Sequence, residues 1–356
     1  MNGQWSLDTH GDPLGAVREV IKDLWLQAGL AGMLVTMPDE AETHVMPRFI
    51  TDPAALDLIN PFMPLMEMNI AKLVPGVIKD HPGTWIGALL RPCELRALIE
   101  MTKHTPINLD HFMTFSVDCL GTLPADEYQW RLERSKKGSQ PAASQTPSPE
   151  DELAGEALKF ARQGGVIPYR YRPACQVCSS PSAGQAEVNL FVLGLPIRQH
   201  ILLSVSAGKL PSSFNLDQLS LQPAGESLVA QHEHVVERMI ERHTRTIQRV
   251  NEALGDQLPE NVEAIIRQLE GCGDCQSCMD VCPICSVDRP YRDANGSYNR
   301  SAVMRWLVSC AGCGMCEQVC PNHLPTAAIF AKIRQQLDQE WEYLPGMSLN
   351  DPLPNL

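Results

Sequence analysis

One cysteine motif occurs twice in the last quarter of this chain. The first copy runs from Cys272 to Cys282 and the second from Cys310 to Cys320, each followed by proline. Both have the spacing C-x₂-C-x₂-C-x₃-C-P, by which bacterial ferredoxins hold a [4Fe-4S] cluster. In two-cluster proteins the fourth cysteine of each run binds the cluster of the other run. The repeat therefore predicts an electron-carrying domain with two [4Fe-4S] clusters.

Crossed ligation assigns four cysteines to each of these clusters. The predicted ligands are Cys272, Cys275, Cys278 and Cys320 for the first cluster, and Cys310, Cys313, Cys316 and Cys282 for the second. Zinc and disulfides are the alternatives, but a structural zinc site closes at four ligands and would leave thiolates of such a run unused. The 27 positions between the motifs, residues 283–309, favour an α-helical dicluster domain over a compact bacterial ferredoxin.

Composition limits where the chain works and what it binds. Its 356 residues carry 13 cysteines and a formal net charge of −13, which argues against nucleic acid or an anionic membrane surface as partner. The stretch Met1–His10 lacks the pattern of a signal peptide, and no apolar run approaches the ~20 residues that span a bilayer. Cysteines without an export signal favour reduced metal ligands in the cytoplasm.

The first part of the chain has the pattern of an α/β domain. Two apolar strands, residues 84–90 and 111–117, each run into a helical stretch, 91–100 and 124–134. Cys93 and Cys119 lie at these two junctions, on the edge where open α/β sheets bind ligands. Helix N-termini also favour thiolate over thiol.

The predicted fold class is an α/β domain followed by a mostly α-helical dicluster ferredoxin domain. Residues 38–83 are expected to be irregular, and the three histidines of the helix at 227–254 to be solvated, namely His232, His234 and His243. The predicted divisions are an α/β domain at 1–225 with a flexible insertion at 135–149, connecting helices at 226–270, the dicluster domain at 271–340 and an extended tail at 341–356.

Five cysteines lie outside the repeat. They are Cys93, Cys119, Cys175, Cys178 and Cys285. From the residues alone, the first two are ordinary buried cysteines or ligands, because buried cysteines are common. The C-x-x-C pair at 175–178 indicates a zinc site, a redox pair or further ligands. Cys285 is interpreted as a non-ligand thiol beside a cluster.

Three segments resemble the beta-subunit family of coenzyme F-420-dependent (deazaflavin-dependent) hydrogenases and formate dehydrogenases. They are Arg91–Ala97, Val117–Gly121 and Arg172–Cys178, within a match that covers about residues 30–205. That family carries a Pro-Cys motif after a strand, a second cysteine in a Cys-His-Gly motif and then a C-x-x-C. The resemblance implies a third [4Fe-4S] cluster, held by Cys93, Cys119, Cys175 and Cys178.

The chain departs from the family pattern at three points. Its ferredoxin segment is C-terminal rather than N-terminal, Leu120 replaces the histidine, and Ser179 stands where an acidic residue is expected. The two substitutions fall where family members handle flavin or deazaflavin. They weaken the case for bound FAD and leave all four cysteines in place.

The predicted function is an iron–sulfur electron-transfer subunit. By resemblance, it would relay electrons between a catalytic subunit of the formate dehydrogenase or hydrogenase type and a second redox protein, within a hetero-oligomeric complex. One alternative is a flavin-containing subunit that reduces a deazaflavin or nicotinamide, and another is a zinc-bound scaffold. The sequence contains neither a Gly-rich phosphate loop nor an evident nucleophile–His–acid arrangement, so no catalytic residue is assigned.

Overall fold

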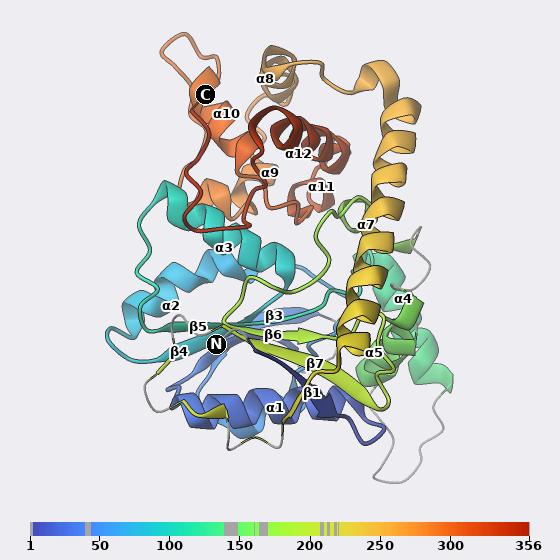
Figure 1. Cartoon of the computed structure of the whole chain (residues 1–356). Coiled ribbons are helices and arrows are strands. Elements are labelled where there is room, and N and C mark those ends of the chain that lie inside the picture. The colour runs from blue at the N-terminus through green and yellow to red at the C-terminus, as the bar shows by residue number, and fades with distance from the viewer. Residues whose placement is uncertain are drawn as a thin grey trace.

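The computed structural model describes residues 3–39, 44–138, 149–159, 161–163, 170–206, 210–211, 214–216, 219 and 221–355. Figure 1 shows a twisted sheet with flanking helices in its lower half and a group of helices from the C-terminal part above it. This confirms the predicted fold class, an α/β region followed by a helical region.

Eight strands form one mixed sheet. They are β1 (Gly3–Asp8), β2 (Met33–Pro38), β3 (Val45–Ile50), β4 (Ile86–Leu90), β5 (Phe112–Val117), β6 (Val188–Phe191), β7 (His200–Val205) and β8 (Gln222–Pro223). Their order is β3-β2-β4-β5-β6-β7-β1-β8. The central strands β2, β4, β5 and β6 run parallel, and the outer strands pair antiparallel.

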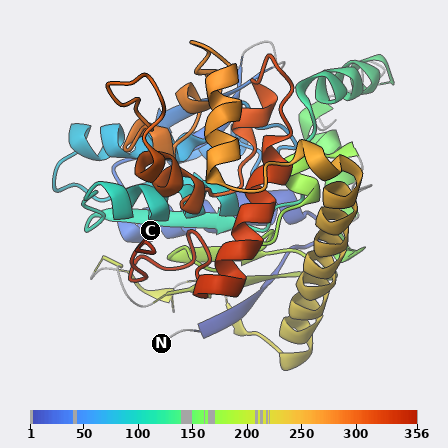
Figure 2. The ribbon, with the colours of Figure 1, turned by 90° about the horizontal axis from the view of Figure 1, so that it is seen from above.

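Helices cover both faces of the sheet and build the C-terminal region. They are α1 (Pro13–Ala28), α2 (Val74–Asp80), α3 (Pro92–His104), α4 (Ala125–Gly138), α5 (Pro149–Lys159), α6 (Pro173–Gln176), α7 (Glu226–Leu254), α8 (Val262–Gly271), α9 (Ser277–Asp280), α10 (Arg300–Val308), α11 (Met315–Gln318) and α12 (Thr326–Trp341). In Figures 1 and 2, α7 runs along one side of the molecule from the sheet to the C-terminal helices, with α12 beside it.

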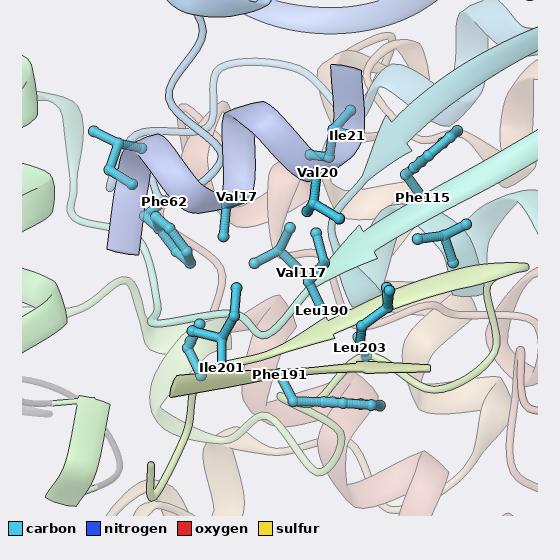
Figure 3. Close-up of a cluster of buried hydrophobic side chains, with 14 of the residues drawn as sticks. Val17, Val20, Ile21, Phe62, Phe115, Val117, Leu190, Phe191, Ile201 and Leu203 are labelled. Atoms are coloured by element: carbon cyan, nitrogen blue, oxygen red, sulfur yellow. The ribbon is translucent and has the colours of Figure 1, made fainter. Parts of the chain in front are cut away.

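The alternation of side chains along the strands divides the core in two. On one face, α1 directs Val17, Val20 and Ile21 at the sheet, where Val117 and Leu190 meet them (Figure 3). On the other face, alternate residues of β4 pack with α3 and with helices of the C-terminal region. The C-terminal helices therefore cover this face of the sheet together with α3.

Several predicted boundaries need correction. Residues 38–83 are not irregular throughout, because they contain β3 and α2, and β1 lies within the first ten residues. Both ends of the predicted insertion at 135–149 are helical, since α4 continues to Gly138 and α5 begins at Pro149. Residues 139–148 lie outside the described part. Among the described residues, no helix has both the length and the apolar character to cross a membrane.

The segment after α12 lies on α3 and is fixed by a buried carboxylate. Glu100 of α3, which is fully buried, accepts hydrogen bonds from the Tyr343 hydroxyl at 2.8 and 2.9 Å and from the Gly346 N–H at 2.7 Å. Lys103 Nζ completes the group at 2.8 Å from Glu100 Oε1. The predicted extended tail at 341–356 thus contains residues packed tightly on their own chain.

Replacing Tyr343 by phenylalanine tests this attachment. The variant leaves a buried carboxylate short of one donor, so we expect Tyr343→Phe to lower the free energy of unfolding by about 1–3 kcal/mol. Urea unfolding of anaerobically prepared protein measures the change. Tyr291→Phe, at a half-exposed tyrosine, is the matched control and should change stability by less than about 0.5 kcal/mol. Equal effects of the two substitutions would contradict the assignment.

Candidate functional site

Four cysteines from outside the repeat line one cavity. Cys93 lies in the first turn of α3 after β4, and Cys119 follows the end of β5. Cys175 lies in the short helix α6, and Cys178 comes two residues after that helix ends. All four border the same cavity, at the carboxyl edge of the parallel strands. The structure thus brings together the residues that the family resemblance selected.

The start of α3 explains how Cys93 is held at this edge. Pro92 occupies the first helical turn, where its missing N–H costs no hydrogen bond. The buried Glu94 carboxylate accepts hydrogen bonds from the Arg91 N–H at 2.8 Å and from the Ile70 N–H at 3.3 Å. These contacts fix the turn that carries the cysteine.

The surroundings of Cys93 and Cys119 disfavour ionisation of these two thiols unless a positive group accompanies them. Burial raises the pKa of the Cys93 thiol well above its ordinary value. Burial, with the Cys175 thiol nearby, raises the pKa of Cys119 to about 12. An iron–sulfur core supplies the positive charge that holds such thiols as thiolates. Four convergent thiols in a buried cavity therefore fit a [4Fe-4S] group.

A single metal ion fits the cysteines less well. In the described part of the chain, no three or more His, Cys, Asp or Glu side chains are grouped closely enough to hold one metal ion. Zinc draws its sulfur ligands to about 2.3 Å from the metal. Four thiols that line one cavity can also hold a [4Fe-4S] core, which is larger than a single ion.

Residues far along the chain close the same cavity. Helix α7 contributes Met239, Arg242 and His243, and the second cysteine motif contributes Gly312 and Cys313. No pattern in the sequence indicates that the two cysteine regions meet here. We refer to Cys93, Cys119, Cys175 and Cys178 as the third group. This group is enclosed by α7 and by the dicluster region, and lies directly beside the second motif.

Two of the histidines predicted to be solvated are buried. His232 is 8% exposed and His243 is 4% exposed, whereas His234 faces solvent. His243 Nδ1 lies 2.6 Å from the Cys178 carbonyl oxygen, and burial lowers the pKa of this histidine. A signal was present, because these two histidines lie on one helical stripe with Met239 and Ile247.

The first motif places its cysteines around the ends of two helices. Cys272 ends α8, Cys275 follows in a turn and Cys278 lies on α9. Burial, together with the nearby thiols of Cys320 and Cys272, raises the pKa of Cys278 to about 11. Asn322 Nδ2, two residues after Cys320, donates to Cys272 Sγ at 3.6 Å. The end of the second motif thus lies beside the first motif.

The second motif repeats this arrangement after α10. Cys310 follows that helix and Cys316 lies on α11. Burial raises the pKa of Cys313 above its ordinary value, and the thiol of Cys282, from the first motif, raises it further. Cys282 also acts on the pKa of Cys310 and Cys316, and on that of Cys278. This proximity supports crossed ligation, although Cys282 lies near cysteines of both motifs.

Cys285 is the thirteenth cysteine and contacts Cys282. It is buried, and its hydrogen bond to Cys282 is the main reason that the pKa of Cys282 is lowered, to about 7. Trp306 Nε1 also donates to Cys282 Sγ at 3.4 Å. Cys285 and Trp306 are therefore donors to a predicted ligand, which suits the interpretation of Cys285 as a non-ligand thiol.

Two buried arginines bind the C-terminal region to the α/β region. Arg96 of α3, 6% exposed, donates to the carbonyl oxygens of Ala311 at 3.1 Å and Ser180 at 2.8 Å. Arg172, 5% exposed, donates to the Cys313 carbonyl oxygen at 3.3 Å and to Gln318 Oε1 at 2.8 Å. Both anchor the second motif at the cavity of the third group.

The second motif packs closely against the C-x-x-C segment at Gly314. A Cβ on this residue would lie 2.2 Å from the Cβ of Ala174, and the backbone has φ +70°, which glycine tolerates best. Glycine is thus required both by the backbone conformation and by the contact. The second motif and the C-x-x-C segment meet here without room for another methyl group.

These features define the class of protein. Residues 268–324 match the family model of the 4Fe-4S dicluster domain. The chain is therefore an iron–sulfur protein in which a dicluster domain follows an α/β region.

One curated relative extends this similarity over nearly the whole chain. The F420-dependent formate dehydrogenase 1 subunit beta of Methanococcus maripaludis is 25% identical over 375 residues, covering 96% of this chain and 93% of that protein. A solved chain of the F420-reducing [NiFe] hydrogenase complex from Methanosarcina barkeri, studied with xenon, matches with a TM-score of 0.49 and 12% identity, covering 69% of this chain and 91% of that one. The full-length relative confirms the predicted resemblance to these beta subunits.

Adding a methyl group at Gly314 should weaken the packing between the second motif and the C-x-x-C segment. Gly314→Ala and Gly296→Ala both place alanine at positive φ, +70° and +86°, but only the first meets a neighbour within 4 Å. Both variants should lose about 1–2 kcal/mol of stability from backbone strain. Gly314→Ala should lose about 1–3 kcal/mol more from overpacking. Urea unfolding of the two variants gives the difference, and equal losses would show that the contact is unimportant.

Proposed function

We propose that this chain is an electron-transfer subunit of an oxidoreductase complex of the formate dehydrogenase or hydrogenase type. It relays electrons between a catalytic subunit and a second redox partner. The observation that carries the proposal is that four cysteines outside the dicluster domain line one cavity together with Cys313 of the second motif. The full-length similarity to a formate dehydrogenase beta subunit supports the type of complex.

The proposed ligands form three groups of four. They are Cys272, Cys275, Cys278 and Cys320; Cys310, Cys313, Cys316 and Cys282; and Cys93, Cys119, Cys175 and Cys178. A [4Fe-4S] cluster at each group supplies a site that takes up and releases one electron. The chain itself supplies the thiolates, the buried surroundings that exclude water, and hydrogen-bond donors such as Trp306 and Thr326 near Cys282 and Cys316.

The proposed division of labour follows the predicted domains. Residues 1–225 hold the third group, 226–270 form the connecting helices, and 271–340 form the dicluster domain. In the tail at 341–356, Tyr343 and Gly346 bind Glu100 of α3. The net charge of −13 favours a docking partner with a basic surface. Reduced cysteines of this number suit assembly in the cytoplasm.

A flavin-containing subunit is the second candidate. The similarity to a subunit of an F420-dependent enzyme favours this candidate, because coenzyme F420 is a deazaflavin. The visible spectrum of anaerobically purified protein separates the candidates. A broad shoulder near about 400 nm alone supports the relay and resolved flavin bands support the flavoprotein, whereas colourless protein would contradict both.

Metal content tests the number of clusters. The purified chain should hold about twelve iron atoms and twelve acid-labile sulfides, four of each per cluster. Cys93→Ala should reduce both to about eight, because it removes a ligand of the third group. Cys285→Ala removes a buried thiol with no proposed ligand role and should keep about twelve. A wild-type value near eight would reject the third cluster and leave the dicluster domain standing.

Crossed ligation has a separate spectroscopic test. If Cys282 serves the second motif, Cys282→Ala should perturb the same electron paramagnetic resonance signal as Cys313→Ala. Cys275→Ala should perturb a different signal, since Cys275 belongs to the other group. A Cys282→Ala spectrum that matches that of Cys275→Ala would show that each motif binds its own cluster.

A further inference from the structure

Arg172 occupies the contact between the third cysteine group and the second motif. It directly precedes α6, the helix that carries Cys175, and is 5% exposed. Nε donates to Thr122 Oγ1 at 2.7 Å, Nη1 to Gln318 Oε1 at 2.8 Å and Nη2 to the Cys313 carbonyl oxygen at 3.3 Å. The guanidinium is thus held from both sides.

Thr122 continues this hydrogen-bonded chain into the third group. Its hydroxyl oxygen lies 3.2 Å from Cys175 Sγ. Because the hydroxyl oxygen accepts from Arg172, its single hydrogen is free to point at the sulfur of Cys175. A continuous polar path therefore joins Cys175 to the Cys313 carbonyl through Thr122 and Arg172.

The first motif is connected differently. None of its three leading cysteines, Cys272, Cys275 and Cys278, borders the cavity of the third group. A different arginine reaches this motif, since Arg292 Nη2 donates to the Gly273 carbonyl oxygen at 3.0 Å in an exposed setting. The residues that surround Cys275 on both sides, Asp274 and Gln276, are exposed. The Cys275 side of this group therefore faces solvent.

We propose that Arg172 is a positioning residue shared by the third group and the second motif, and that its charge raises the reduction potential at both sites. The third-group site and the second-motif site are then adjacent in the electron path. The first-motif site is then terminal and faces a redox partner. This inference rests on the proposed function. It involves one electron per site and no bond that forms or breaks.

The physical reason is a fixed charge in a buried contact. Arginine stays protonated in proteins, so burial cannot remove its charge as it can for lysine. A positive charge favours the more negative, reduced state of any group near it, and the effect is larger where water is excluded. Hydrogen bonds to ligand sulfurs act in the same direction. Arg172 acts by charge on both sites, and Thr122 acts by a hydrogen bond on one.

Redox titration followed by electron paramagnetic resonance tests the inference on the intact chain. Signals are assigned with Cys93→Ala, Cys275→Ala and Cys316→Ala. Arg172→Gln should lower the reduction equilibrium constants of the third-group and second-motif signals about tenfold, which is about 59 mV for a one-electron couple. The first-motif signal should keep its potential. Arg172→Lys retains a charge and should shift both potentials less.

Two further variants control for a merely structural role. Arg292→Gln changes the arginine that contacts the first motif and should shift only the first-motif signal. Thr122→Val removes the hydroxyl without changing the charge and should lower only the third-group potential. Iron content near the wild-type value shows that each variant has folded.

The proposal is overturned if Arg172→Gln leaves both potentials unchanged, or if it shifts the first-motif signal as much as the other two. It is also overturned if Arg172→Lys shifts the potentials as far as Arg172→Gln, because the charge would then have no role. A wild-type iron content near eight instead rejects the third cluster of the proposed function. In that case the effect of Arg172 on the second-motif potential can still be measured.

Discussion

A buried arginine must be given hydrogen-bond acceptors, because it cannot shed its charge. Arg96 and Arg172 meet this requirement with main-chain carbonyls and side-chain oxygens from both parts of the chain. Separation of the α/β region and the dicluster domain would therefore break the hydrogen bonds of both guanidinium groups to the second motif. The close approach of Gly314 to Ala174 depends on this attachment, and so does the position of Cys313 at the cavity of the third group.

The spacing of the cysteines in the last quarter of the chain predicted the dicluster domain well. Eight cysteines in two runs of the same spacing were enough to predict the dicluster domain, and the family model agrees over residues 268–324. The central strands β4 and β5 were also predicted, because strands covered on both faces are continuous apolar runs. Strands β1 and β3 were missed because they are half-exposed and mixed in polarity, and β3 contains Pro47.

The third site could be predicted only in part. Cys93 and Cys119 follow strands, a local pattern, and the family resemblance added Cys175 and Cys178. The roles of α7 and of residues 312–313 depend on tertiary contacts between segments far apart in sequence, which no local pattern reports. Arg172 illustrates the limit. In the sequence it is one arginine before a proline, and its position between two cysteine groups becomes visible only in the folded chain.

The attachment of Tyr343 to Glu100 joins residues 243 positions apart. Every cysteine of both motifs lies between these two partners in the chain, so this hydrogen-bonded contact closes a loop of the chain that contains the whole dicluster domain. Closing so long a loop costs entropy that only a compact intervening segment can reduce. Folding of the two motifs therefore favours the contact of Tyr343 and Gly346 with α3, and by the same linkage this contact stabilises the folded motifs.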